Sequence, residues 1–175
     1  MWETILATLV GEFSDLNDVA HTTRVTLRMA LATVLGGLLG WEREQQGKSA
    51  GVRTHMLVAL GSALFVIAAE QMGAEDDAMS RVIQGVVAGI GFLCAGTILK
   101  GRSPSEVQGL TTAAGIWLTC AIGLTVGLGR EATALLATGF ALIILNLVPH
   151  LMGRLDKKGA EQGQLYQEDE EPPQK

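Results

Sequence analysis

The chain has 175 residues, of which 48% are hydrophobic and 18% are charged, and its formal net charge is −5. Much of the acidity lies in two short runs and no basic stripe is present, which argues against a nucleic-acid partner. The charges are clustered in the sequence, whereas a soluble domain of this length has its charges spread along the chain. The composition therefore predicts an all-α, polytopic membrane protein.

Five charge-free runs predict the transmembrane helices. A hydrocarbon core of about 30 Å takes roughly 20 helical residues, so the last three runs are long enough to span it and the first two are short. We predict one domain of five transmembrane helices at 24–153, an N-terminal segment at 1–23 and a polar tail at 154–175. The runs are 29–41, 54–69, 82–99, 107–129 and 132–153.

The N-terminal segment has an apolar face at helical spacing. This periodicity predicts a short amphipathic helix that lies on the membrane surface. No positively charged stretch precedes an apolar one, so we expect no cleaved signal peptide. The residues of the face are Trp2, Ile5, Leu6, Leu9, Val10 and Phe13.

Lysine and arginine are distributed asymmetrically about the predicted helices. They gather after the first, third and fifth helices, and such residues stay on the cytoplasmic side. We therefore predict an N-terminus outside, with the 1–23 segment on that face, and a cytoplasmic C-terminus. The residues are Arg43, Lys48, Arg53, Lys100, Arg102, Arg154, Lys157 and Lys158.

The tail from 157 to 175 is polar, with an acidic run and two adjacent prolines. It holds too little apolar surface to offset the entropy that it would lose on ordering. We therefore predict that this cytoplasmic tail is disordered.

The second and fourth predicted helices begin with similar segments, GVRTHM at Gly51 and GLTTAA at Gly109. Each segment places a glycine, an aliphatic residue and a threonine near the helix N-terminus. The similarity predicts two helix hairpins that pack as parallel repeats and bring two positive helix ends together.

Three G-x-x-x-G pairs lie on predicted helices one, three and four. Helices in lipid associate through close backbone contact at small residues, so these faces predict tight packing. The pattern leaves open whether each face joins helices within one chain or between chains. The pairs are Gly36 and Gly40, Gly85 and Gly89, and Gly123 and Gly127.

The first apolar run is short and ends at charged residues. As a helix, 29–41 would extend only about 20 Å, which is less than the hydrocarbon core. Either Arg28 or the charges at 42–44 must therefore be drawn toward the membrane. Arg28 can place its charge in the headgroups, because its long stem remains in lipid.

A polar cluster follows this run, and two interpretations of it are open. It is either a functional site at the cytoplasmic rim that receives a cation, a proton or a partner's charged group, or a salt-bridged hairpin. In the hairpin, Arg53 would pair with Glu42 or Glu44. These glutamates lie about 200° apart on a helix, so at most one of them faces the bundle. The cluster comprises Glu42, Arg43, Glu44, Lys48, Arg53, Thr54 and His55.

Other chemical signatures are missing from the sequence. No carboxylate falls near the middle of a predicted span, where proton-coupled carriers usually need one. No phosphate-binding loop, triad spacing or metal-ligand cluster is present, so we expect no enzyme and no catalytic residue. Glu42 and Glu44 are the candidates for a contact with a metal ion.

Four segments of the sequence, in the same order, resemble the membrane domain of the MgtC/SapB family. They cover about 27–129, and the fifth predicted helix is compatible with the family. Longer members carry a soluble domain after this helix, where the present sequence has a short polar tail. The segments are LRMALATVLGGLLGWERE, KSAGVRTHMLVALGSALF, GVVAGIGFLCAGTIL and GLTTAAGIWLTCAIGLTVG.

The resemblance implies a bacterial inner-membrane protein linked to Mg²⁺ homeostasis and to adaptation to low Mg²⁺. For some members it implies a role in virulence and restraint of the F-type ATP synthase. It suggests no cofactor other than Mg²⁺. By motif, it adds Thr111 and Thr112 to the functional candidates, and Gly91 and Gly96 to the packing candidates.

Two functions are therefore open. One is a membrane regulator that binds other membrane proteins, itself included, and adjusts Mg²⁺ or energy homeostasis. The other is a homo-oligomeric channel or carrier that lines a cation pathway with Glu42, Glu44 and threonine hydroxyls. Five helices are few for a monomeric carrier, so the second function requires an oligomer.

Overall fold

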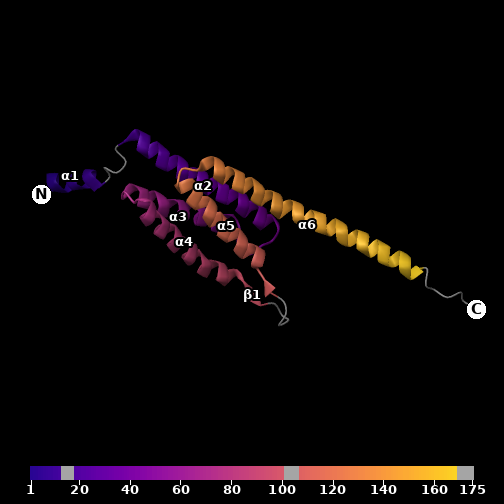
Figure 1. Ribbon diagram of the computed structural model, residues 1–175. Coiled ribbons are helices and arrows are strands. Elements are labelled where there is room, and N and C mark those ends of the chain that lie inside the picture. The colour runs from indigo at the N-terminus through magenta and orange to yellow at the C-terminus, as the bar shows by residue number, and fades with distance from the viewer. Residues whose placement is uncertain (13–17, 101–106, 169–175) are drawn as a thin grey trace, which may run out of the picture. The chain divides into compact units, whose positions relative to one another are not determined.

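The computed structural model describes residues 1–12, 18–100 and 107–168 (Figure 1). The chain divides into two compact units, Met1–Thr138 and Gly139–Lys175. The elements in chain order are α1 (Trp2–Glu12), α2 (Val19–Gln45), α3 (Val52–Gln71), α4 (Asp76–Thr97), β1 (Leu99–Lys100), β2 (Val107–Gln108), α5 (Leu110–Gly127) and α6 (Glu131–Glu168).

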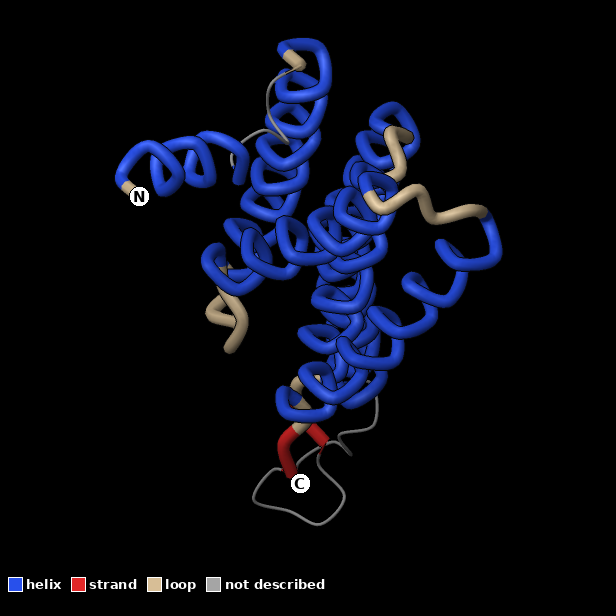
Figure 2. Tube along the Cα trace, turned by 90° about the vertical axis from the view of Figure 1, so that its left-hand side faces the viewer, coloured by secondary structure: helices blue, strands red, loops and turns tan. Residues whose placement is uncertain are grey.

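Helices form nearly all of the described chain, which confirms the predicted all-α class. A short antiparallel pair of strands, which the apolar runs do not predict, lies between α4 and α5. Leu99 pairs with Gln108 and Lys100 with Val107, and Figure 2 shows the strands at one end of the helix bundle. The pairing brings the end of α4 next to the start of α5.

Among the described residues, four helices are long and apolar enough to cross a membrane: α3, α4, α5 and the part of α6 from Glu131 to Pro149. These four make the chain a multi-pass membrane protein. α2 is longer, with 27 residues, or about 40 Å at the helical rise. It is not one of the four, because charged residues flank its short apolar run. A fifth span and the orientation of the termini stay predictions.

α2 begins before the predicted domain boundary at residue 24. Its N-cap is Asp18, whose side chain accepts a hydrogen bond from the backbone amide of Ala20 at 3.0 Å. Aspartate favours this position, because its carboxylate satisfies an amide that has no helical partner. The turns of α2 that follow Asp18 are polar, so the helix begins before the apolar run.

α3 packs between α2 and α5 through glycines on both of its neighbours. A Cβ atom at Gly36 of α2 would lie 2.5 Å from a carbonyl oxygen of α3, and one at Gly123 of α5 would meet another. Gly40 and Gly127 are also in close contact with α3. Two of the three G-x-x-x-G pairs therefore pack helices within one chain, because a side chain at these positions would separate the backbones.

α4 packs differently, since none of its residues is buried. One face, which includes Ile83, Val86 and Ile90, packs against buried side chains of α3 and α5. No atom lies within 4 Å of a Cβ position at any glycine of α4. The third G-x-x-x-G pair thus has no packing partner in the described part of the chain. The four glycines are Gly85, Gly89, Gly91 and Gly96.

α6 continues to Glu168 and contains Pro149. Where the sequence predicts disorder, at 157–168, the structure has helix. This part of the chain is rich in glutamine, glutamate and lysine, which are good helix formers even where no apolar face is present. The prediction for 169–175 lies outside the described residues.

Candidate functional site

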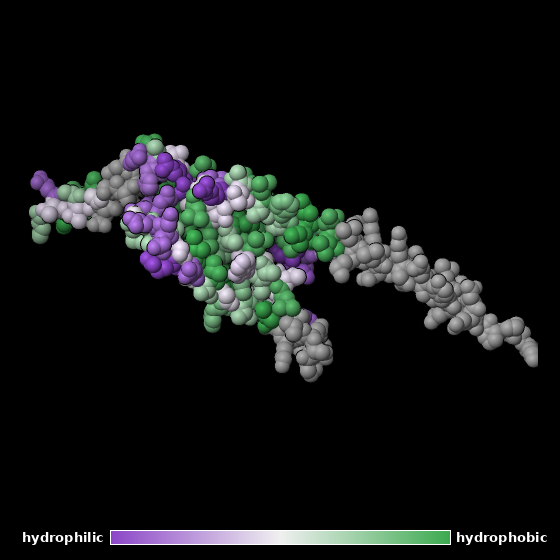
Figure 3. All heavy atoms as spheres, in the orientation of Figure 1, coloured by the Kyte–Doolittle hydropathy of each residue, from purple (hydrophilic) through white to green (hydrophobic). Residues whose placement is uncertain are grey.

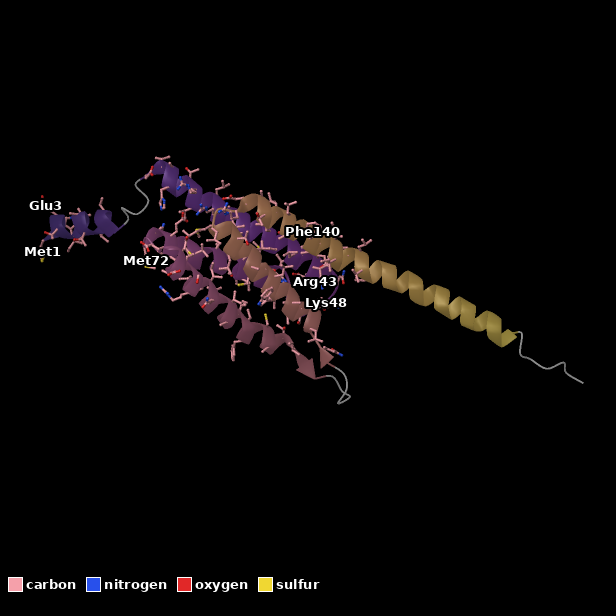
Figure 4. All side chains as sticks on the ribbon, viewed as in Figure 1. Met1, Glu3, Arg43, Lys48, Met72 and Phe140 are labelled. Carbon is pink, nitrogen blue, oxygen red and sulfur yellow. The ribbon has the colours of Figure 1, made fainter. Side chains whose placement is uncertain are left out.

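Polar side chains gather at both ends of the first unit. Arg43 and Lys48 lie at one end, and Met72, in the turn from α3 to α4, lies at the other (Figure 4). We call these the Arg43 end and the Met72 end. Every predicted functional residue belongs to the Arg43 end, in the last turns of α2, the following loop, or the first turns of α3 and α5.

A tight reversal of the chain builds the Arg43 end. Gly47 follows α2 with a φ of 65°, a conformation that favours glycine, and Gly51 caps α3. A Cβ atom at Gly40 would lie only 2.6 Å from the Cα atom of Val52. Glycines in the helix and in the loop therefore bring the last turns of α2 directly against the first turn of α3.

Arg43 is the most buried charged residue of the cluster, with 3% of its surface exposed. Its Nε donates to Oε2 of Glu42 at 2.5 Å, and its Nη2 donates to Oε1 at 2.7 Å. Gln46 donates to the same carboxylate at 2.7 Å. A bidentate pair of this kind neutralises the buried guanidinium and satisfies most of the carboxylate.

Glu44 has a different partner. Its carboxylate accepts a hydrogen bond from the backbone amide of Val52 at 2.9 Å, so it caps α3 across the loop. A negative charge at a helix N-terminus is favourable, because the first amides have no helical partner and carry partial positive charge. A Cβ atom at Gly51 would lie 2.5 Å from this carboxylate, so glycine makes room for the cap.

His55 is completely buried in the first turns of α3. Its Nδ1 lies 3.0 Å from the carbonyl oxygen of Gly51, which fixes Nδ1 as the donor and leaves Nε2 as an acceptor. Among the described residues, Nε2 has no hydrogen-bond partner. A Cβ atom at Gly115 of α5 would lie 3.6 Å from Nε2 and 3.9 Å from Cδ of Arg43. The ring therefore faces α5 beside Arg43.

The remaining members of the predicted cluster lie at its surface. Arg53 and Lys48 are exposed and Thr54 is half-buried. The ion pairs of the described residues do not include Arg53, so the pair with Glu42 or Glu44 that the hairpin interpretation requires is not formed, and Glu42 pairs with Arg43 instead. The reason is the rotation of α2, which turns Arg43 inward and Glu44 toward solvent.

Thr111 and Thr112 lie in a separate polar pocket of about 420 Å³. Lys48 and Ser49 line it from the loop after α2, and Thr97 lines it from the end of α4. Thr112 is buried, whereas Thr111 is exposed. The structure thus brings Lys48 together with the two threonines.

The Met72 end contains a network that sequence reasoning missed. Nη1 of Arg28 donates to Glu70 at 2.6 Å and to the carbonyl oxygen of Gly127 at 3.0 Å, and Nε lies 3.7 Å from Glu131. The Arg28 side chain is only 12% exposed, because it pairs with groups of the bundle. The sequence contained one indication of this network. Arg28 precedes the first apolar run and Glu70 follows the second, so the predicted topology places both on the same side of the membrane.

Glu42 and Glu44, the predicted metal candidates, each have their own protein partners. Within the described residues, no three His, Cys, Asp or Glu side chains come together in a way that could hold a metal ion. A role for Mg²⁺ as a ligand of this chain stays a prediction.

A bundle of apolar helices with an ion pair near each end defines the class of this protein, a multi-pass membrane protein. The family model described as the MgtC family matches residues 29–154. The chain therefore belongs to the MgtC family, as its four motifs predict.

Named relatives match the chain over most of its length. It is 42% identical over 134 residues to SrpB of Synechococcus elongatus, covering 70% of this chain and 73% of SrpB. It is 38% identical over 144 residues to YhiD of Escherichia coli, covering 78% and 66%, and YhiD is provisionally described as a magnesium transporter. It is 38% identical over 145 residues to MgtC of Brucella abortus, covering 83% and 58%. The chain thus spans under two thirds of that MgtC, and no solved structure matches it.

Proposed function

We propose that this protein is a regulator in the bacterial inner membrane that contributes to Mg²⁺ homeostasis and to adaptation to low Mg²⁺. It acts without enzymatic chemistry, by binding other membrane proteins and further copies of itself. The magnesium-related description of YhiD supports the physiological role. The F-type ATP synthase, which the family resemblance suggests, is one candidate partner.

The exposure of α4 is the observation that carries this proposal. α4 is a candidate span of 22 residues with no buried residue, and Phe92 on it is 87% exposed. Gly91 and Gly96 of α4 have open space at their Cβ positions, in contrast to the glycines of α2 and α5. The hydrophobic effect does not drive helices together in lipid, so helices associate there through close backbone contact. A surface that permits this contact is therefore suited to bind a helix of a partner protein.

Crosslinking from α4 tests the proposal. A photo-crosslinking residue at Phe92 should capture a second membrane protein in native membranes, and capture more of it from cells starved of Mg²⁺. The matched control is Leu64 of α3, which is also apolar and exposed. If Phe92 yields only copies of this chain under starvation, or captures no more than Leu64, the protein is not such a regulator.

The description of YhiD as a magnesium transporter favours one alternative, an oligomeric cation channel or carrier. In that case the path would lie between copies, because α2, α3 and α5 pack backbone to backbone. The purified protein in liposomes should pass Mg²⁺, and Glu42→Gln should reduce the flux. Flux equal to that of protein-free liposomes, measured with a folded preparation, would exclude this function.

A further inference from the structure

α3 and α4 enclose an apolar groove of about 580 Å³ on the first unit. Gly61 of α3 and Gly85 and Gly89 of α4 line it, and no atom lies within 4 Å of a Cβ position at any of the three. Leu57 and Leu93 line it toward the Arg43 end. The glycines therefore create the groove, since side chains at these positions would project into it.

The surroundings of the groove are apolar along most of its length. Figure 3 shows hydrophobic residues in a broad band over these helices, and hydrophilic residues gathered at the Met72 end. Atoms beside an unfilled space lose dispersion contacts, so a groove in the hydrocarbon region is stabilised by an apolar occupant that fits it. A groove lined by glycines has room for a flexible acyl chain.

Charges follow the groove in a definite order along α4. Arg81 lines the groove, is exposed, and takes no part in the ion pairs of the described residues. Asp77, one turn nearer the start of α4, is about 6 Å further along the axis, and Asp76 and Glu75 follow it. From the groove outward the sequence is thus apolar, then cationic, then anionic.

We propose that this groove binds one phospholipid with a primary ammonium in its headgroup, an aminophospholipid. The acyl chain lies along the three glycines, the phosphate contacts Arg81, and the ammonium contacts Asp77, which lies one turn before Arg81 on nearly the same face of α4. Glu70, near the end of α3, is already paired with Arg28. The site goes beyond the proposed function and does not depend on it.

The order of charges decides between classes of lipid. A lipid with only a phosphate and a neutral alcohol in its headgroup would use Arg81 but leave the carboxylate of Asp77 without a counterion. A quaternary ammonium is charged but cannot donate hydrogen bonds to it. Both lipids should therefore bind more weakly than the aminophospholipid, by about two- to fivefold, as expected when exposed ion pairs are lost.

Native mass spectrometry of the full chain in mild detergent tests the proposal. The protein is mixed with equal amounts of phosphatidylethanolamine, phosphatidylglycerol and phosphatidylcholine, and the lipid retained per chain is measured. We expect one phosphatidylethanolamine to be retained preferentially. Retention of all three lipids in equal amounts would overturn the site.

Variants locate the binding on the groove. Gly85→Leu fills the groove and should abolish the preferential retention, and the smaller change Gly85→Ala should weaken it. Ala88→Leu is the matched control, because Ala88 is on the same helix, exposed, and outside the groove lining. An equal loss from Ala88→Leu, or no loss from Gly85→Leu in a chain that elutes as a folded species, would refute the assignment.

Headgroup variants keep the test informative if Gly85→Leu does not fold. Arg81→Gln should reduce retention of all three lipids, and Asp77→Asn should remove the preference for phosphatidylethanolamine over phosphatidylglycerol. The same spectra report the mass of the assembly. If Gly85→Leu instead dissociates a dimer and leaves lipid retention unchanged, the groove holds a second copy and the lipid proposal is wrong.

Discussion

At the residue scale, Arg43 and Glu42 form the most consequential contact of the Arg43 end. Their side chains are 3% and 9% exposed, and the carboxylate holds the guanidinium through two hydrogen bonds. Removing one partner of a buried pair leaves the other charge without compensation, which costs more than the pair contributes when intact. The buried ion pair of the cluster is therefore formed between adjacent residues of one helix, α2.

Glu42→Gln should lower the free energy of unfolding by about 3–5 kcal/mol, because Arg43 would remain buried without a counterion. Arg53→Ala should change it by less than about 0.5 kcal/mol, because Arg53 is exposed and outside the ion pairs described above. The measurement is the thermal midpoint in detergent, together with the level in membranes. Equal effects of the two variants would show that the pair between Arg43 and Glu42 contributes no more to stability than the exposed Arg53 does.

Glu44→Ala should destabilise the protein by about 1 kcal/mol, because the Val52 amide loses its cap and α3 loses a negative charge at its N-terminus. Gln45→Ala, a change at the adjacent exposed position, should have little effect. The free energies of unfolding of both variants are compared in the same detergent. Identical values would mean that the cap contributes nothing.

At the scale of the elements, glycine has opposite roles in neighbouring helices. On α2 and α5, glycine pairs allow α3 to pack against both helices. On α4, the same motif borders open space. α3 is therefore the centre of the bundle, while α4 presents a surface to lipid or to a partner.

Gly123→Ala and Gly89→Ala separate these roles. The methyl group at Gly123 would meet backbone atoms of α3, so the substitution should cost about 1–3 kcal/mol of unfolding free energy. At Gly89 the methyl group has room, so stability should be unchanged or rise by up to about 1 kcal/mol, as alanine favours helix. Thermal midpoints of the two variants decide this, and a loss at Gly89 as large as that at Gly123 would contradict the packing described above.

At the scale of the whole molecule, the helices separate two polar ends. The Arg43 end carries the loop basic residues, and the Met72 end carries Arg28, Glu70 and the acidic start of α4. The distribution of lysine and arginine predicts that the Arg43 end is cytoplasmic. The structure places these groups at opposite ends, and the side of the membrane to which each belongs is open to direct test.

Labelling with a membrane-impermeant maleimide tests the predicted orientation. In a chain with Cys94 and Cys120 replaced by alanine, Met72→Cys should react in intact cells, and Lys48→Cys should react only after the membrane is opened. Both positions are exposed, so accessibility within the protein does not limit either reaction. The reverse pattern would invert the topology, and the lipid site would then lie in the cytoplasmic leaflet.

Much of the fold follows from local sequence. Apolar runs located the helices from α3 to α6, and Gly51 and Gly109, the starts of the two similar segments, are the N-caps of α3 and α5. These features are predictable because the insertion of a helix into the hydrocarbon core, and the residues at which it begins and ends, depend on residues within a few turns of one another. The extension of α2 to Val19 and the helix at 157–168 were missed, since polar helices carry no apolar run.

Much of the candidate site did not follow in this way. The sequence predicted that charges meet near the membrane's edge, and it identified the family. Only the tertiary structure decided that Arg43 rather than Arg53 holds a glutamate, that Arg28 pairs with Glu70, and that two of three identical glycine motifs are buried. The physical reason is that these contacts depend on how each helix is rotated about its axis and placed against its neighbours, which no local pattern specifies.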